Sequence, residues 1–367
     1  MKKNTNDTIN VLMVGSAINV KGGMTTVVKS FINHNFNKNN VNLKYIPTHI
    51  EAKNVLIKLV YFIRQLLCIL YYLICKRIDI VHIHMSENGS FRRKYIIFTL
   101  SKKLNKCVVT HLHGAEFDSY YDNAKKRTKK QVRNLLGKSD LVITLGERWN
   151  QIINRIEPKS KKYILRNAVK IPDIQNKLKL RNINLVFLAV VIKRKGILDL
   201  VHASKGVISK LSAMGIKCKI IVGGDGELLP TIKDMVEESG IQENYEFLGW
   251  VDGDLKTSLL KKTDVLVLPS YNEGLPLSII EAMSYGIPII TTDVGSINEA
   301  VKDNINGFLI NPGDQEALEE KIIQLISDSS KYIKMGEMSK KIARDNFNID
   351  IYFENLCEQY RLLILKK

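Results

Sequence analysis

The chain has 367 residues, of which 45% are hydrophobic and 25% charged, and its formal net charge at pH 7 is +18. This composition excludes a disordered tail, a collagen and a coiled coil, and the length predicts two domains. The charge is unequally distributed: residues 1–180 hold 33 basic and 11 acidic side chains, a net charge of +22, whereas residues 181–367 hold 22 and 26, a net charge of −4. The first half is therefore expected to attract an anionic partner, such as nucleic acid, an anionic membrane or a phosphorylated substrate.

The cysteine pattern and the first residues bear on where the protein works. The number of cysteines is odd and no two form a CxxC pair, so a reducing cytoplasm fits better than a disulfide framework or a zinc ribbon. The five are Cys68, Cys75, Cys107, Cys218 and Cys357. The polar start Met1-Lys2-Lys3-Asn4 leads into no apolar h-region, so we do not expect a secretory signal peptide.

Short runs rich in Val, Ile and Leu alternate with helical patterns along the whole chain. The expected strands are Ile9–Val14, Ile80–Ile83, Val108–Leu112, Leu141–Leu145, Leu185–Val191, Lys219–Val222, Val265–Leu268 and Ile289–Thr292. The clearest helical patterns are Met24–Asn33, Leu198–Met214, Leu277–Tyr285 and Gln315–Asp328. This alternation predicts an α/β fold of two doubly wound, Rossmann-like domains, each with a parallel sheet between layers of helices.

The polar stretch Pro172–Arg181 is the expected domain boundary, because the charge balance changes sign there. We therefore assign residues 1–175 to an N-terminal domain, joined by a C-terminal helix at 350–367, and residues 180–349 to a C-terminal domain. Ligands of doubly wound domains bind outside the carboxyl ends of the strands, so a ligand cleft is expected between the two.

Residues 55–74 form an apolar stretch long enough to cross a bilayer. Lys58 and Arg64 lie within it, and a charge at membrane depth is costly. Polar or small side chains recur every three or four residues, which predicts a helix with a wide apolar face and a narrow polar stripe. The stripe consists of Lys58, Tyr61, Gln65, Cys68, Tyr72 and Lys76. We favour a helix buried against a sheet, keep a surface helix that dips into lipid as the alternative, and favour a spanning helix least.

The first candidate for chemistry is the loop that ends in Gly22-Gly23, between the first strand and its helix. Paired glycines at the start of a helix let backbone N–H groups approach a phosphate, assisted by the helix dipole. The loop is neither a GxGxxG nor a Walker motif, and a simple tight turn is the plainer interpretation.

Two histidine doublets, His82-Ile83-His84 and His111-Leu112-His113, form the second candidate. Residues i and i+2 of a strand share a face, so each doublet could present two ligands to one metal, with Glu116 and Asp118 nearby. We favour the interpretation in which one histidine of each doublet is buried and the others lie at strand ends near a ligand. A zinc hydrolase is the alternative.

The third candidate is Tyr271-Asn272-Glu273-Gly274-Leu275-Pro276, which follows an apolar strand and leads into a helix that carries Glu281. Amides at 274–277, where that helix starts, can bind a phosphate or a sugar oxygen, and carboxylates suit sugar hydroxyls. An ordinary acid at a helix N-terminus is the plainer interpretation of Glu273.

The stretch from Phe247 to Asp314 resembles the donor-binding half of the family 4 glycosyltransferases, which are E-x7-E retaining enzymes of group 1 type with the GT-B fold. The resemblance rests on the spacing of Glu273 and Glu281, on the Gly-Leu-Pro after the first glutamate, on Glu-Ala-Met followed by Gly-Ile-Pro, and on Asn-Gly-Phe-Leu-Ile with the later Pro-Gly. It covers nearly the whole chain, densely after residue 185, and extends to Gly223-Gly224-Asp225-Gly226-Glu227, Asn167, His113-Gly114 and Gly22-Gly23.

Carried over to this sequence, the resemblance implies a role for each matching residue. The amides of Gly22 and Gly23 would face the donor diphosphate, and His113 would hydrogen-bond the transferred sugar. Lys195 would neutralise the leaving diphosphate, and Glu273 would hold hydroxyls of the sugar. Glu281 would bind the ribose, and the other donor-binding residues would be Arg194, Gly224, Gly274, Leu275 and Pro276. The resemblance implies no metal, because cationic side chains and helix N-termini stabilise the developing negative charge.

One departure from the family pattern concerns the diphosphate. The family's arginine follows a glycine five residues before the lysine, where this sequence has Ala189-Val190. Loss of one of two expected cations predicts that the transition state loses about 3 kcal/mol of stabilisation, unless Lys193 or Arg194 replaces the missing arginine.

The resemblance implies transfer of a sugar from a nucleotide-diphosphate sugar, with a UDP-sugar favoured, to a glycan or a polyprenyl-diphosphate-linked acceptor of a bacterial capsule or lipopolysaccharide. The first domain would bind the acceptor, and its basic segments would hold it on the cytoplasmic face of an anionic membrane. These segments are Arg92-Arg93-Lys94, Lys102-Lys103, Lys125-Lys126-Arg127 and Lys129-Lys130-Arg133, and solvated helix faces are the alternative. We expect no nucleic-acid partner, because no nucleic-acid-binding motif is present.

Two alternatives within the fold remain open besides the zinc hydrolase. A nucleotide-sugar epimerase would convert the donor without any acceptor. A scaffold subunit that has lost turnover through Val190 would bind nucleotide and form no product.

Overall fold

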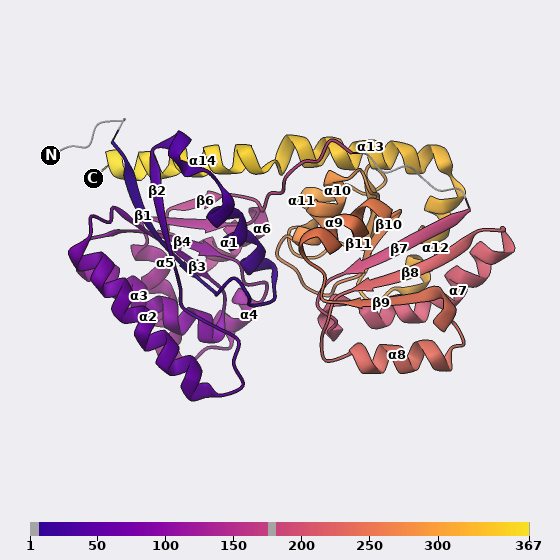
Figure 1. The fold of residues 1–367 in the computed structure, drawn as a ribbon, viewed down its shortest axis with the longest axis horizontal. Coiled ribbons are helices and arrows are strands. Elements are labelled where there is room, and N and C mark those ends of the chain that lie inside the picture. The colour runs from indigo at the N-terminus through magenta and orange to yellow at the C-terminus, as the bar shows by residue number, and fades with distance from the viewer. Residues whose placement is uncertain (1–6, 175–180, 367) are drawn as a thin grey trace. The chain divides into compact units, whose positions relative to one another are not determined.

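The computed structural model describes residues 7–174 and 181–366, which divide into two compact units. The first unit comprises the chain up to Arg166 together with 350–367, and the second comprises Asn167–Ile349. The division falls upstream of the expected boundary at 172–181, of which residues 175–180 lie outside the described part of the chain. Each unit holds a six-stranded parallel sheet flanked by helices, so the predicted α/β fold of two doubly wound domains is confirmed (Figure 1).

The first sheet has the strand order β2-β1-β3-β4-β5-β6. Its strands are β1 (Ile9–Gly15), β2 (Val41–Pro47), β3 (Ile80–Met85), β4 (Cys107–Leu112), β5 (Leu141–Thr144) and β6 (Lys162–Ile164). Its helices are α1 (Gly23–Asn33), η1 (Phe36–Asn39), α2 (Val55–Cys75), α3 (Asn88–Lys103), α4 (Phe117–Asp122), α5 (Lys126–Lys138), α6 (Glu147–Ile156) and α14 (Ile349–Leu365).

The second sheet has the strand order β12-β11-β10-β7-β8-β9. Its strands are β7 (Asn182–Leu188), β8 (Lys217–Gly223), β9 (Tyr245–Gly249), β10 (Val265–Leu268), β11 (Ile289–Thr292) and β12 (Gly307–Ile310). Its helices are η2 (Lys193–Lys195), α7 (Ile197–Ala213), α8 (Leu229–Glu238), η3 (Gln242–Asn244), α9 (Gly253–Lys262), α10 (Leu277–Ser284), α11 (Ile297–Ala300), α12 (Gln315–Ser327) and α13 (Ser329–Asn346).

Each sheet has one place where the chain reverses the direction in which it adds strands. In the first sheet this switch point lies between β1 and β3, and in the second it lies between β7 and β10. Loops after two neighbouring strands diverge at a switch point and leave a crevice at the carboxyl ends, where doubly wound folds bind ligands. The loops of interest are therefore those that follow β1, β3, β7 and β10.

All eight expected strands exist, and the four unexpected ones are the edge strands β2, β6, β9 and β12. Central strands of a parallel sheet are buried on both faces and read as continuous apolar runs, whereas edge strands keep polar side chains. The expected strand 185–191 is shorter than predicted at its carboxyl end, because β7 stops at Leu188 and the Val191 N–H bonds to the Asp225 carbonyl of another loop.

The prediction that residues 55–74 are buried against a sheet is wrong. α3 packs on β3 and β4, which leaves α2 to pack on α3 and on the edge strand β2 (Figure 1). Only Phe62, Ile69 and Leu73 of α2 are buried. The predicted polar stripe is half-buried except for the exposed Lys76, whereas the apolar face is exposed. Among the described residues, α2 alone is long and apolar enough to cross a membrane, and 17% of its most apolar window is buried.

Candidate active site

The switch point of the second sheet brings Lys195 and Glu273 together, although they are 78 positions apart in sequence. β7 and β10 are neighbours in register, Leu185 opposite Val265, and both end at the same edge of the sheet. The loop after β7 continues into η2 and Lys195, and the loop after β10 carries Glu273. The topology therefore produces a contact that no local pattern specifies.

The Lys195 Nζ lies 2.5 Å from Glu273 Oε1, and the two side chains are only 14% and 5% exposed. Ser270 Oγ donates a second hydrogen bond of 2.8 Å to the same carboxylate oxygen. A buried carboxylate persists as an ion only when cationic and hydrogen-bonding partners replace water, and these two residues do so. The result is a rigid acceptor of hydrogen bonds beside an ammonium group.

Glu281 lies in the second turn of α10 and also pairs with a lysine. Lys256 Nζ of α9 lies 2.5 Å from Glu281 Oε1, with the side chains 21% and 14% exposed. The second predicted carboxylate is thus paired with an ammonium group supplied by a different helix. Such a carboxylate can accept hydrogen bonds from the hydroxyls of a ligand.

The loop between Glu273 and α10 is fixed by hydrogen bonds to its backbone carbonyl groups. Ser296 N–H donates to the Gly274 carbonyl and the Asn167 amide donates to the Leu275 carbonyl, each over 2.8 Å. Pro276 is the N-cap of α10, no side chain caps that helix, and its first turn contains no acid. The first N–H groups of α10 can therefore bind an anion or a sugar oxygen.

Two residues, Gly224 and Arg194, restrict the loop that follows β7. A Cβ on Gly224 would lie 1.8 Å from the Ala189 carbonyl oxygen, so only glycine permits this approach of two backbones. Arg194 Nη1 donates a 2.8 Å hydrogen bond to the Asn272 carbonyl, which ties the loop to that of Glu273. Val190 is half-buried in this loop, and Lys193 is exposed.

In the first unit, Gly22 and Gly23 lie where β1 leads into α1. Gly22 has φ +142, a Cβ built on either glycine would meet no atom within 4 Å, and no side chain caps α1. The first turn of α1 contains no acid. An open, uncapped helix start of this kind attracts an anion, as the sequence predicts for a diphosphate.

Four histidine rings form a ladder across β3, β4 and the turn after β4. His84 and His111 face each other in the strand register. His82 Nε2 lies 3.3 Å from His111 Nδ1, and His84 Nδ1 lies 2.8 Å from His113 Nε2. Tyr360 of α14 shares a 2.5 Å hydrogen bond with His82 Nδ1 and closes one end. His82, His84 and His111 are all buried and His113 is half-buried, so the prediction of one buried histidine in each doublet is wrong for the first doublet.

A hydrogen bond between two imidazoles needs one N–H and one lone pair, so at most one ring of each bonded pair can be protonated. Burial lowers the pKa of His82 and of His113 to about 3, with His113 adding to the shift of His82. Burial, together with the neighbouring histidines, lowers the pKa of His84 and His111 well below its ordinary value. His113 therefore presents an uncharged ring, suited to hydrogen bonding rather than to charge neutralisation.

The ladder also includes a group that could hold a metal. One ring nitrogen from each of His82, His84 and His111 lies within 4.8 Å of the others, and Nε2 of His84 and of His111 has no partner among the described residues. A catalytic zinc needs an open position for water, whereas these three rings are buried. Within the described ranges no carboxylate joins the group, and Glu116 is exposed. The geometry thus disfavours a zinc hydrolase.

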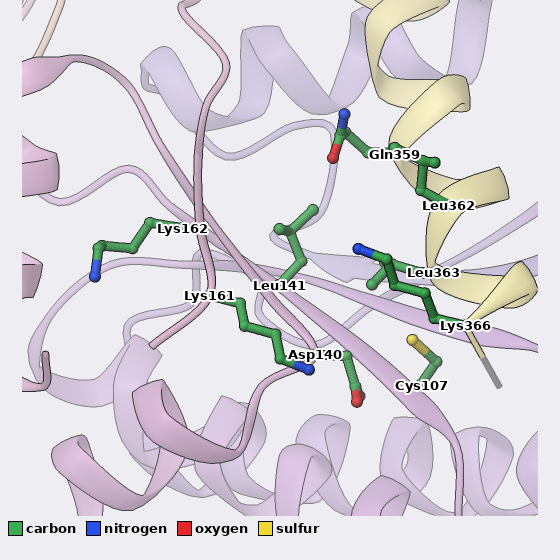
Figure 2. Close-up of a pocket in the computed structure, with 9 residues that line it drawn as sticks. All are labelled: Cys107, Asp140, Leu141, Lys161, Lys162, Gln359, Leu362, Leu363 and Lys366. Carbon is green, nitrogen blue, oxygen red and sulfur yellow. The ribbon is translucent and has the colours of Figure 1, made fainter. Parts of the chain in front are cut away.

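A pocket of about 330 Å³ lies at the opposite edge of the first sheet, at the amino ends of β4, β5 and β6 (Figure 2). Its lining residues are Cys107, Asp140, Leu141, Lys161, Lys162, Gln359, Leu362, Leu363 and Lys366. Doubly wound domains place their ligands at the carboxyl edge, so this pocket is not the candidate site.

Ser270 and Lys256 are the site residues that the sequence analysis missed. Ser270 precedes Glu273 by three residues in the same loop, so the proximity of a hydroxyl to the acid was a local signal. Lys256 lies 25 positions before Glu281 on another helix, and only the fold joins the two.

Comparison with known proteins identifies the class to which this arrangement belongs. A sucrose-phosphate synthase structure from Thermosynechococcus elongatus superposes with a TM-score of 0.82 at 16% identity, covering 98% of this chain and 100% of that one. The two sheets and their topology are therefore the GT-B fold. Residues 170–342 match the family described as glycosyl transferases group 1. The match covers 47% of the chain and lies in its second unit, and the resemblance to group 1 glycosyltransferases is confirmed.

Relatives with curated names agree with this match. The UDP-Gal:alpha-D-GlcNAc-diphosphoundecaprenol alpha-1,3-galactosyltransferase of Escherichia coli is 28% identical over 318 residues, covering 81% of this chain and 79% of that protein. The capsular polysaccharide biosynthesis glycosyltransferase CapM of Staphylococcus aureus is 29% identical over 193 residues, 51% of this chain and 48% of that protein. Two further relatives are 25% and 30% identical to this chain. The chain spans less than half of their length, 44% of the first and 42% of the second.

Proposed function

We propose that the chain is a retaining glycosyltransferase that moves a sugar from a UDP-sugar to a glycan or a lipid-diphosphate-linked acceptor, in the biosynthesis of a bacterial surface polysaccharide. One observation carries the proposal: in a domain that matches the group 1 glycosyl transferases, Glu273 and Glu281 each form an ion pair with a lysine. The name of the Escherichia coli relative specifies a UDP-sugar donor and a diphosphoundecaprenol-linked acceptor, and that of the Staphylococcus aureus relative specifies capsular polysaccharide.

The side chains divide the donor between them. Glu281 accepts hydrogen bonds from the ribose hydroxyls, and Glu273 accepts them from the sugar hydroxyls. Lys195, which pairs with Glu273, neutralises the leaving diphosphate as its charge develops. Gly22 and Gly23 offer backbone N–H groups to the diphosphate, Arg194 and Gly224 shape the loop after β7, and His113 bonds to the sugar with a neutral ring.

The reaction proceeds on one face of the sugar. The bond between the anomeric carbon and the diphosphate oxygen breaks, the acceptor oxygen forms the new bond on the same face, and the leaving phosphate takes the acceptor proton. Fixed cations and helix N-termini stabilise the leaving group without reorganisation, and no metal takes part. The protein works at the cytoplasmic surface of the cell membrane, where a lipid-linked acceptor is available.

Nucleotide binding tests the first step. UDP, GDP, ADP and CDP are added to the full chain with and without divalent metal, and the free energy of unfolding is measured. UDP at a hundred times its dissociation constant is expected to stabilise the wild type by about 2.7 kcal/mol without metal. Glu281→Gln removes the negative charge and one of the two acceptor oxygens offered to the ribose, and should weaken this stabilisation.

The matched control is Glu246→Gln, because Glu246 pairs with Lys219 at 3.0 Å on the amino edge of the same sheet. It should leave the UDP effect unchanged. No response of the wild type to any nucleotide contradicts the proposal. Conversion of the donor to an epimer without acceptor would identify the epimerase instead, and an inverted anomer in the product would exclude retention.

A further inference from the structure

We infer that α2 is an interfacial membrane helix, and that its exposed apolar face rests in the anionic leaflet of a phospholipid bilayer. The inference deepens the proposed function, on which it rests for the lipid-linked acceptor, by naming the surface that meets the membrane. It starts from a helix whose polar and apolar faces are the reverse of those expected for a soluble domain.

The exposed apolar side chains of the molecule are concentrated on this helix. Of the 22 large hydrophobic side chains that are exposed in the described part of the chain, nine belong to α2, with exposed fractions from 49% to 74%. They are Val55, Leu56, Ile57, Leu59, Val60, Ile63, Leu67, Tyr71 and Ile74. Leu56, Val60, Ile63, Leu67, Tyr71 and Ile74 recur at steps of three or four residues and so form one stripe, about 30 Å long.

The opposite face of α2 explains why the helix lies on the surface and does not span the bilayer. Phe62, Ile69 and Leu73 are buried against the domain, and the half-buried Lys58 and Gln65 face the same way. A spanning helix would have to leave its packing on α3 and β2 and take Lys58 and Arg64 into hydrocarbon, which is costly. A helix lying in the interface keeps these contacts and buries only its outer stripe.

The charge around α2 favours a bilayer over a second copy of the chain as the partner of its apolar face. Residues 52–78 contain no Asp or Glu and five basic residues, namely Lys53, Lys58, Arg64, Lys76 and Arg77. Lys53 precedes the stripe, Lys76 and Arg77 follow it, and all three are exposed. A twofold dimer through α2 would bring like charges together, whereas anionic lipid headgroups complement them.

The position of α2 fits an acceptor held in the membrane. The segment 48–54 leads from the carboxyl end of β2 directly into α2, so the helix begins at the edge of the sheet where Gly22, Gly23 and His113 lie. Of the basic segments expected to meet the membrane, Arg92-Arg93-Lys94 on α3 contributes only in part. Lys94 is fully buried and donates to Thr48 Oγ1 over 2.6 Å, so that expectation is wrong for this residue, whereas Arg92 is exposed.

Vesicle binding by the full chain tests the inference. Sucrose-loaded vesicles of phosphatidylcholine alone, or of equal parts phosphatidylcholine and phosphatidylglycerol, are sedimented with the wild type. Binding is expected on the anionic vesicles, weaker at high salt, and reversed by an alkaline carbonate wash. The double variant Val60→Glu with Leu67→Glu should bind about a hundredfold more weakly. Burying each of these apolar side chains in lipid raises the affinity about tenfold or more.

The control double variant is Leu255→Glu with Ile333→Glu, because both side chains are exposed in the second unit. It should bind vesicles as the wild type does. Equal vesicle binding by the α2 variant, or none by the wild type, overturns the inference. So does a wild-type dimer in light scattering that the α2 variant converts to a monomer while neither binds vesicles.

Nucleotide stabilisation of the same variants separates this inference from the proposed function. The α2 variant should keep the wild-type response to UDP. Loss of vesicle binding alone leaves the proposed function intact, whereas vesicle binding without any nucleotide response supports the membrane helix and contradicts the transferase.

Discussion

The two sheets share an architecture, yet their carboxyl edges are built from opposite electrostatics. In the second unit the edge carries full charges, with Lys195 on Glu273 and Lys256 on Glu281. In the first unit the main features of this edge are the neutral histidine ladder and the uncapped start of α1, and its buried Lys94 donates to the Thr48 hydroxyl. Six of the seven histidines of the chain lie in the first unit, and the remaining one is His202.

Under the proposed function, this difference would suit the two units to two tasks. The paired lysine could exchange its carboxylate contact for the diphosphate of the donor. The neutral imidazoles could hydrogen-bond hydroxyls without competing for the diphosphate. The same comparison predicts that the units respond differently to lost charge, to acid and to added charge.

The largest effect is expected from Lys195→Met. Among the described residues, the substitution leaves the buried Glu273 carboxylate with the Ser270 hydroxyl as its side-chain partner, and breaking a buried pair costs about 3–5 kcal/mol. Chemical denaturation followed by circular dichroism measures the loss. Transfer activity should fall about a hundredfold or more, because the diphosphate loses a cation.

The exposed pair of Lys219 and Glu246 provides the control, as Lys219→Met should change stability by less than about 1 kcal/mol. The double variant Lys195→Met with Glu273→Gln should recover stability without recovering activity. A stable single variant would mean that water replaces the lysine and that the site is less dry than its exposure indicates.

Acid should unfold the first unit before the second. The ladder histidines have folded pKa values lowered by burial, to about 3 for His82 and His113, against about 6.5 when unfolded. The unfolded chain therefore binds more protons as the pH falls below 6.5, and each such histidine removes about 1.4 kcal/mol of stability per pH unit. This stability is fully present above pH 6.5.

Each unit has one tryptophan, Trp149 in the first and Trp250 in the second, which allows the test. Fluorescence of Trp149 in a Trp250→Phe variant and of Trp250 in a Trp149→Phe variant reports each unit between pH 7 and 5. Simultaneous transitions, or earlier loss of the second unit, would contradict a neutral ladder as the acid-sensitive element.

The smallest effect is expected from Val190→Arg, which adds a cation to the charged edge. Lys193 and Arg194 follow Val190 in the same loop, and we expect them to supply the second positive charge already. The variant should therefore change turnover by less than about tenfold. A gain of about a hundredfold in steady-state kinetics would show that the site lacks a cation and that the wild type is a weak enzyme.

How much of this fold was predictable varies with position in the sheet. β10 and β11 are apolar runs that any parallel sheet would bury, and both have the bounds that their composition predicts. β6 (Lys162–Ile164) is half-buried throughout and has no apolar run, because an edge strand pairs with only one neighbouring strand. Its existence follows from pairing with β5, a contact made at a distance in sequence.

The sequence by itself determined the residue types of the site and the class of the fold. The spacing of Glu273 and Glu281 and the glycines at 22–23 are local features, visible because short-range geometry restricts which residues can start a helix or bind a sugar. Helical periodicity likewise revealed that the helix at 55–75 has a polar and an apolar side.

Only the tertiary structure decided which side of that helix faces the protein, and which lysine neutralises each glutamate. Periodicity is the same for a helix turned in or out, and the outcome depends on α3, which already occupies the sheet face and leaves α2 the edge strand. Lys195 and Lys256 reach their glutamates because adjacent strands end together and because α9 carries a lysine up to α10. Long-range packing determines both the orientation of this helix and the pairing of the lysines. Burial of the whole sheet, rather than any local preference, stabilises that packing.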